Sequence, residues 1–108
     1  MPAALDGVRI ADFSHLIAGP YCAMMLADMG AEVIKIEPPG GDAARGFTPP
    51  DLEGESPTFL SMNRNKHGVM LDLSVEDGRQ VAREIVAKSD VLLENFATGV
   101  MPRLGLGY

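Results

Sequence analysis

Short apolar runs alternate along this chain with segments rich in glycine, proline and charged residues. Val8–Asp12 and Glu32–Glu37 contain β-branched residues in brief apolar runs, which is typical of strands. Between them, residues 20–29 place apolar side chains at the i, i+3, i+4 and i+7 spacing of a helix that Gly30 ends. Because this segment has almost no polar residues, we expect the helix to be covered on more than one side.

The second half of the chain shows the same order of elements. Gly68–Leu73 and Asp90–Glu94 predict the third and fourth strands. An apolar stripe between them predicts a helix that runs to about Lys88, with a capping signature that begins at Ser74. Thr98 is the predicted cap of a last short helix.

The middle of the chain is less regular. Asp42–Pro57 carries proline, glycine and charge without a sustained period, which predicts a long loop. Thr58–Met62 favours a single helical turn. The polar cluster Asn63–His67 precedes the third strand, and we interpret it as a solvated basic turn, with ligand binding as the alternative.

The order strand–helix–strand, long loop, strand–helix–strand is typical of a parallel sheet with right-handed crossovers. We therefore predict an α/β fold, a Rossmann-like parallel sheet with helices on both faces, as an incomplete half of a larger architecture. Loops 13–19, 38–47, 72–74 and 95–98 follow the four strands and should meet at the carboxyl edge of the sheet. A helix that starts there offers backbone N–H groups to an anion, so this edge is the predicted ligand crevice.

Length and charge narrow the possible functions. A chain of 108 residues accommodates one small domain, and a net charge of −6 argues against nucleic acid or an anionic membrane as a partner. The sequence shows neither a leader-like start nor an apolar run of about 18 residues, so we expect a soluble cytoplasmic protein. Cys22, the single cysteine, excludes an internal disulfide and is interpreted as a packing residue, with a reactive thiol as the alternative.

Three residues near the predicted crevice are candidates for chemistry. His15 has the chemistry to donate a hydrogen bond to a phosphate or to act as an acid or base, but local backbone contacts would satisfy it equally well. Arg45 suits a phosphate clamp or a solvated surface, and Glu37 falls where dinucleotide-binding folds place a ribose-binding acid. The single glycine in the first loop disfavours nicotinamide or flavin binding. With no P-loop, metal cluster or nucleophilic triad in the pattern, spacing alone indicates an anion-binding half domain without a metal.

Four sequence blocks carry more specific information. They are Leu5–Phe13 with Ala18-Gly19-Pro20, Asp28–Asp42, Asn63–Lys66 with Leu71–Leu73, and Glu94–Phe96 with Arg103–Gly105. In this order they resemble the family III CoA-transferases, a group that includes formyl-CoA and carnitine-CoA transferases and also α-methylacyl-CoA racemases. The last two blocks are more similar to the transferase branch.

The resemblance implies a site for CoA or acyl-CoA, which is a substrate of this family and no permanently bound cofactor. Ile17 and Ala18 would contact CoA through their backbone, Pro38 would lie beside the adenine and Arg103 at a phosphate. Formyl-CoA transferase-like members carry a polar residue in place of Ile17 and a basic one in place of Pro38, so the choice of substrate does not carry over. The implied CoA-binding residues are His15, Ile17, Ala18, Pro38, Leu71, Asp72, Leu73, Ser74, Asn95, Phe96, Ala97 and Arg103.

Members of this family are several times longer, and their nucleophilic aspartate lies in a part that corresponds to positions beyond Tyr108. The resemblance therefore implies that residues 1–108 are the amino-terminal, Rossmann-like CoA-binding portion, with no catalytic residue of its own and no activity alone. The full enzyme would be an interlocked homodimer that moves CoA from an acyl-CoA to a carboxylic acid. The alternatives are an acyl-CoA racemase of the same fold and a non-catalytic CoA- or nucleotide-binding module.

Overall fold

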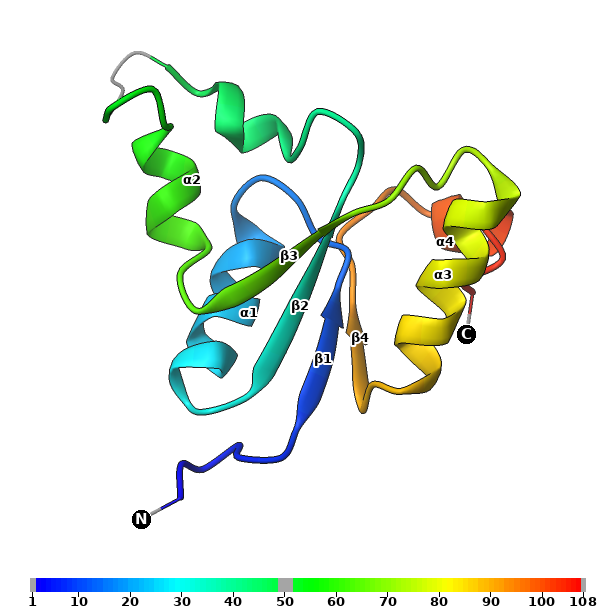
Figure 1. The fold of residues 1–108 in the computed structure, drawn as a ribbon, viewed down its shortest axis with the longest axis horizontal. Helices are drawn as coiled ribbons and strands as arrows, with labels where there is room; N and C mark the ends of the chain where they lie inside the picture. The colour runs from blue at the N-terminus through cyan, green and yellow to red at the C-terminus, as the bar shows by residue number, and fades with distance from the viewer. Residues whose placement is uncertain (1, 49–51, 108) are drawn as a thin grey trace.

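The computed structural model describes residues 2–48 and 52–107 and contains a parallel sheet of four strands in the order β3-β2-β1-β4 (Figure 1). This arrangement confirms the predicted Rossmann-like α/β fold. The elements in chain order are β1 (Arg9–Asp12), α1 (Ala18–Asp28), β2 (Glu32–Glu37), the 3-10 helix η1 (Ala43–Gly46), α2 (Pro57–Met62), β3 (Lys66–Met70), α3 (Glu76–Ala87), β4 (Val91–Leu93) and α4 (Val100–Arg103).

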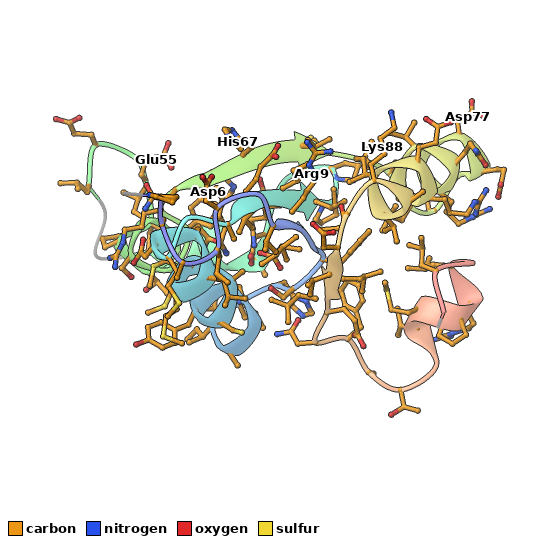
Figure 2. The ribbon with its side chains drawn as sticks, turned by 90° about the horizontal axis from the view of Figure 1, so that it is seen from below. Asp6, Arg9, Glu55, His67, Asp77 and Lys88 are labelled. Atoms are coloured by element: carbon orange, nitrogen blue, oxygen red, sulfur yellow. The ribbon has the colours of Figure 1, made fainter. Side chains whose placement is uncertain are left out.

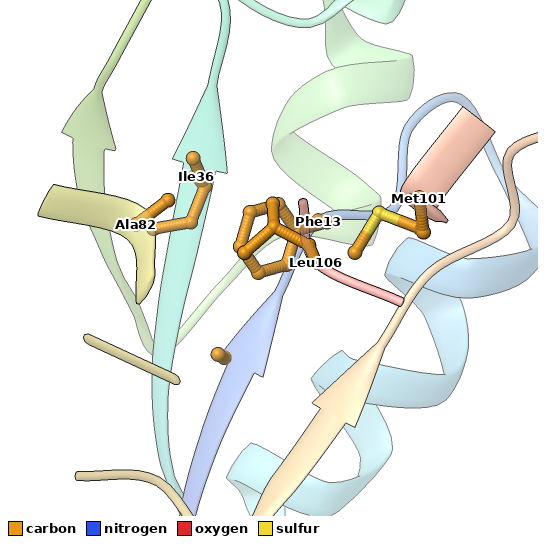
Figure 3. Close-up of a cluster of buried hydrophobic side chains, with 6 residues drawn as sticks. Phe13, Ile36, Ala82, Met101 and Leu106 are labelled. Atoms are coloured by element: carbon orange, nitrogen blue, oxygen red, sulfur yellow. The ribbon is translucent and has the colours of Figure 1, made fainter. Parts of the chain in front are cut away.

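The two central strands send successive side chains to opposite faces, which divides the core into two clusters. Ile10 packs with Ala23 and Ala27 of α1 on one face. Ala11, the next residue of β1, packs on the other face with residues of α3 and α4. Figure 3 shows this second cluster, in which Phe13 lies among side chains from the sheet and from both helices. Helices therefore cover both faces, as the sequence predicts.

Helix α1 packs on its face of the sheet through an inner side of small residues. The buried residues include Ala23 and Ala27, whose small side chains let the helix lie close to the sheet. An outward row at four-residue spacing is largely exposed: Ile17, Tyr21, Met25 and Met29. Helix α1 contacts α2 as well as the sheet, so the expected cover on more than one side is present, although this outward row stays exposed.

Strand β3 begins two residues earlier than predicted and ends at Met70. Its pairing with β2 starts where Lys66 lies opposite Val33, so Lys66 belongs to the sheet and not to a preceding turn. Figure 2 shows the next side chain, His67, pointing away from the strand on the side opposite α1. Strand β3 lies at the edge of the sheet, and its face opposite α1 is exposed at His67.

Two predicted helix caps are wrong. Val75, not Ser74, precedes α3 and makes no side-chain cap, because the Ser74 hydroxyl donates to Asp72 at 2.5 Å. Gly99, with a left-handed φ of 90°, replaces Thr98 at the start of α4. The segment predicted as a continuous loop contains η1, and α2 begins at Pro57. Within residues 2–48 and 52–107, none of the helices has the length and apolar character needed to cross a membrane.

Candidate functional site

A cavity of about 560 Å³ lies at the carboxyl edge of the sheet. Its walls include residues from all four loops that the sequence predicts to meet there, namely 13–19, 38–47, 72–74 and 95–98. The first two loops come from the central strands β1 and β2, and Leu104 adds an apolar side chain that follows α4. The structure therefore confirms the predicted position of the crevice at the carboxyl edge of the sheet.

The predicted site residues divide into two groups around this cavity. His15, Pro38, Asp72, Leu73, Ser74 and Phe96 line it, whereas Ile17, Ala18, Leu71, Asn95, Ala97 and Arg103 do not. Ile17 and Ala18 are exposed at the start of α1, and Leu71 packs against the core. Arg103 is exposed, and its Nε donates to the carbonyl of Gly99 at 3.2 Å.

His15 is held by its backbone, and its ring keeps an unused polar atom. Its N–H donates to Oδ1 of Asn95 at 3.0 Å, and Nδ2 of Asn95 donates back to its carbonyl at 2.9 Å. The imidazole stacks on Phe96 with ring centroids 5.3 Å apart. Among the described residues, Nδ1 of His15 is buried without a hydrogen-bond partner. Local contacts therefore satisfy the backbone but not the ring.

Asn95, which the family resemblance implies as a CoA-binding residue, contacts the first loop. Both of its side-chain polar atoms bond to the His15 backbone, and it does not line the cavity. Its visible function is to fasten the first loop to the loop after β4. A terminal amide pairs well with one peptide unit because it offers a donor and an acceptor side by side.

A buried ion pair links β2 to the loop that follows it, and both of its members contact the first loop. Nζ of Lys35 lies 2.9 Å from Oδ2 of Asp42, and the two side chains are 2% and 1% exposed. Burial disfavours the Asp42 carboxylate, but the amide of Ala44 and the Lys35 ammonium outweigh it and hold the pKa of Asp42 below its ordinary value. The same ammonium donates to the carbonyl of Ser14 at 3.2 Å.

A second buried pair lies beneath the start of α1. Nζ of Lys66 is 3.0 Å from Oδ2 of Asp12 and also donates to the carbonyl of Pro20 and to Asn63. Burial lowers the pKa of Lys66 from its ordinary value, although Asp12 opposes this shift. The interpretation of this basic cluster as solvated is therefore wrong for Lys66. It holds for Arg64, which is exposed and pairs with Asp28 at the surface.

Glu37 and Arg45 hydrogen-bond to each other, which leaves few of their polar atoms available to a ligand. Nε and Nη2 of Arg45 donate to the two Glu37 oxygens at 2.8 and 3.0 Å, and the guanidinium lies 3.8 Å from the centroid of Phe59. Burial opposes ionisation of Glu37, but Arg45 and the amide of Asp42 hold the pKa of Glu37 below its usual value. The geometry therefore supports neither a ribose-binding Glu37 nor a phosphate clamp by Arg45.

Sequence reasoning missed the structural importance of Lys35, Asp12 and Asp42. One signal was available for Lys35, which shares a strand face with Val33 in a sheet predicted to have helices on both faces. A charge in such a position needs a partner, because burying an unpaired ammonium is very costly. No comparable signal identified the partner.

The comparisons with known proteins agree with the geometry. The model of "CoA-transferase family III" matches residues 5–108. The succinyl-CoA–L-malate CoA-transferase beta subunit of Chloroflexus aurantiacus is 46% identical over 105 residues, which are 96% of this chain and 26% of that protein. The formyl-CoA:oxalate CoA-transferase of Bradyrhizobium sp. (strain ORS 278) is 45% identical over 97% of this chain and 25% of its own length.

The crystal structure of a CaiB/BaiF family protein from Brucella suis has the same fold. It superposes with a TM-score of 0.94 at 38% sequence identity and covers 100% of this chain and 30% of its own. The present chain thus spans about a quarter of the length of the curated relatives named above.

Proposed function

Because the chain belongs to CoA-transferase family III, we propose that residues 1–108 are the CoA-binding portion of an enzyme that moves CoA from an acyl-CoA to a carboxylic acid. The observation that carries this proposal is the cavity built by the four loops at the carboxyl edge of the sheet. CoA enters the proposal as a substrate and not as a resident cofactor. The proposal places the enzyme in the cytoplasm.

Within the proposal, the described residues bind and orient CoA. Phe13, Phe96 and Leu104 give the cavity apolar walls, and Pro38, which also lines it, is the proposed contact for the adenine. The unused Nδ1 of His15 suits a phosphate or carbonyl oxygen. Outside the cavity, backbone N–H groups at the start of α1 and the exposed Arg103 are the proposed further partners for phosphate.

The proposal assigns the chemical step to an aspartate in the longer enzyme, after the position of Tyr108. Its carboxylate attacks the thioester carbonyl of the donor and releases CoA as a thiolate, which leaves a mixed anhydride. Splitting the transfer into such covalent steps lowers each barrier. The transferase names of both relatives favour this reaction over racemisation. The full enzyme is proposed to be an interlocked homodimer, and the exposed apolar row of α1 supports a further contact.

The isolated chain is expected to bind CoA or dephospho-CoA weakly and to show no turnover, because it supplies the loops but not the nucleophile. Isothermal titration calorimetry measures binding, and mass spectrometry of thioester exchange measures turnover. A complete absence of binding by the folded chain would contradict the proposed CoA site. Robust exchange, with contaminating enzyme excluded, would contradict the assignment of the nucleophile to another segment.

Arg103→Ala is expected to weaken CoA binding by about 1–3 kcal/mol, the scale of a hydrogen bond to a charged group. The difference should shrink in high salt because Arg103 is exposed. Arg64→Ala is the matched control, since Arg64 is also an exposed arginine but pairs with Asp28 at the end of α1. Equal affinities of the Arg103→Ala variant and the unmodified chain at low salt would remove Arg103 from the phosphate site.

A further inference from the structure

Asp42 connects three parts of the cavity wall through one carboxylate. Its Oδ2 is paired with Lys35 of β2. Its Oδ1 accepts from the N–H of Leu16 at 3.1 Å and from the N–H of Ala44 at 2.9 Å. The first of these bonds reaches the loop that carries His15, and the second begins η1 in its own loop.

The backbone before Asp42 is shaped to deliver it to this place. Gly40 and Gly41 have left-handed φ values of 89° and 88°, a conformation that favours glycine. The N–H of Gly41 donates to the carbonyl of Pro38 at 2.8 Å, which closes a tight turn after β2. The N–H of Asp42 then donates to Glu37 at 2.9 Å. These contacts within the loop after β2 hold the Asp42 backbone in place independently of the first loop.

Stability alone does not explain this ion pair. Removing two charges from water costs several kcal/mol each, and apolar residues of similar volume often stabilise a core as well. An apolar pair would not accept the N–H of Leu16, nor would it donate to the carbonyl of Ser14 as Lys35 does. The specific consequence of the pair is the position of the loop between those two residues.

We propose that Asp42, held by Lys35, is a positioning residue that fixes His15 at the wall of the CoA site. Ser14, His15, Lys35 and Asp42 all line the same cavity, and the two bonds to the first loop flank His15 on either side. The inference rests on the proposed function for the identity of the ligand only. Its geometric content concerns the first loop in the ligand-free chain.

The test compares three variants of the 108-residue chain. Asp42→Ala removes the contacts of this side chain with Leu16, Ala44 and Lys35, whereas Asp42→Asn keeps an oxygen for the N–H groups of Leu16 and Ala44. Val33→Ala is the control. Val33 is fully buried and lies on the same strand and the same face as Lys35, but it belongs to the apolar cluster under α1. The cavity that this substitution leaves in the core lowers stability without removing a side chain that contacts the first loop.

Histidine NMR gives a readout that needs no ligand. The chain has two histidines, and His67 is exposed on β3, so its ring signal is an internal reference for that of His15. Asp42→Ala is expected to shift or broaden the His15 signal alone and to weaken CoA binding about tenfold or more, since small misplacements of binding groups are costly. Asp42→Asn should recover part of both, because its oxygen still accepts from Leu16 although Lys35 loses its anionic partner. Val33→Ala should lower Tm without either effect.

Two results would overturn the inference. One is an unchanged His15 signal in Asp42→Ala. The other is a loss of affinity in Asp42→Ala that matches the loss in Val33→Ala. If the unmodified chain fails to bind CoA, the proposed function fails, whereas the histidine spectra still decide whether Asp42 positions His15.

Discussion

Replacing Lys66 with methionine is expected to lower the free energy of unfolding by about 3–5 kcal/mol, the cost of breaking a buried ion pair by removing one partner. The side chains of Lys66 and Asp12 are 2% and 0% exposed, and their charged atoms are 3.0 Å apart. Methionine roughly preserves the length of the side chain, so the variant leaves the Asp12 carboxylate buried without its cation. It also removes the donor to the carbonyl of Pro20 inside α1. Denaturant unfolding measures the change.

Arg9→Met is the matched control for an ion pair at the surface. Arg9 and Glu32 are also 3.0 Å apart, but their side chains are 39% and 45% exposed, so the expected loss is below about 1 kcal/mol. Adding Asp12→Asn to Lys66→Met should restore part of the stability, because it removes the unpaired charge. Equal small losses in Lys66→Met and Arg9→Met would show that burial adds nothing to the pair.

Much of the fold was predictable because hydrophobic spacing is a local property. The apolar runs of β1 and β2 and the apolar stripe of α3 indicate a strand or a helix by their spacing alone, whatever these elements pack against. The cavity was predictable for a related reason, since the carboxyl ends of parallel strands share one edge once the order of elements is known. His15, Pro38 and Phe96 reach that edge as expected.

The buried charges were not predictable in the same way, because their partners depend on register. Lys66 meets Asp12 across 54 positions of sequence, and only because Lys66 lies opposite Val33 when β3 pairs with β2. A slip of one residue would turn Lys66 to the other face of the sheet. In the sequence, Lys66 stands between exposed Asn65 and exposed His67, and composition does not separate it from them.

The wrong prediction of a helix cap at Ser74 has a local cause. Ser74 lies two residues after Asp72, and its N–H and hydroxyl both bond to that carboxylate. Short polar side chains compete for nearby backbone and side-chain groups, so a serine before a helix does not guarantee a cap. Asp42 shows the opposite outcome, because it does cap η1 while also pairing with Lys35.

Gly19→Ala is expected to destabilise the chain, although alanine is favoured over glycine inside helices by about 1 kcal/mol. Gly19 lies in the first turn of α1, where an added β-carbon would overlap Cβ of Ser14 and lie 2.6 Å from its hydroxyl oxygen. Ser14 is not free to move, because its N–H bonds to Asp12 and its carbonyl accepts from Lys35. Overpacking of this kind costs about 1–3 kcal/mol, so the clash should outweigh the helical gain.

Gly46→Ala isolates the effect of this contact. Apart from its chain neighbours, no described residue lies within 4 Å of a β-carbon built on Gly46, which ends η1 without a left-handed φ. Its unfolding free energy should change by no more than about 0.5 kcal/mol. Gly19→Val should lose more than Gly19→Ala, because its branched side chain adds volume to the same contact. A gain of stability in Gly19→Ala would show that Ser14 yields at little cost. The two buried ion pairs would then not hold the first loop as rigidly as their geometry indicates.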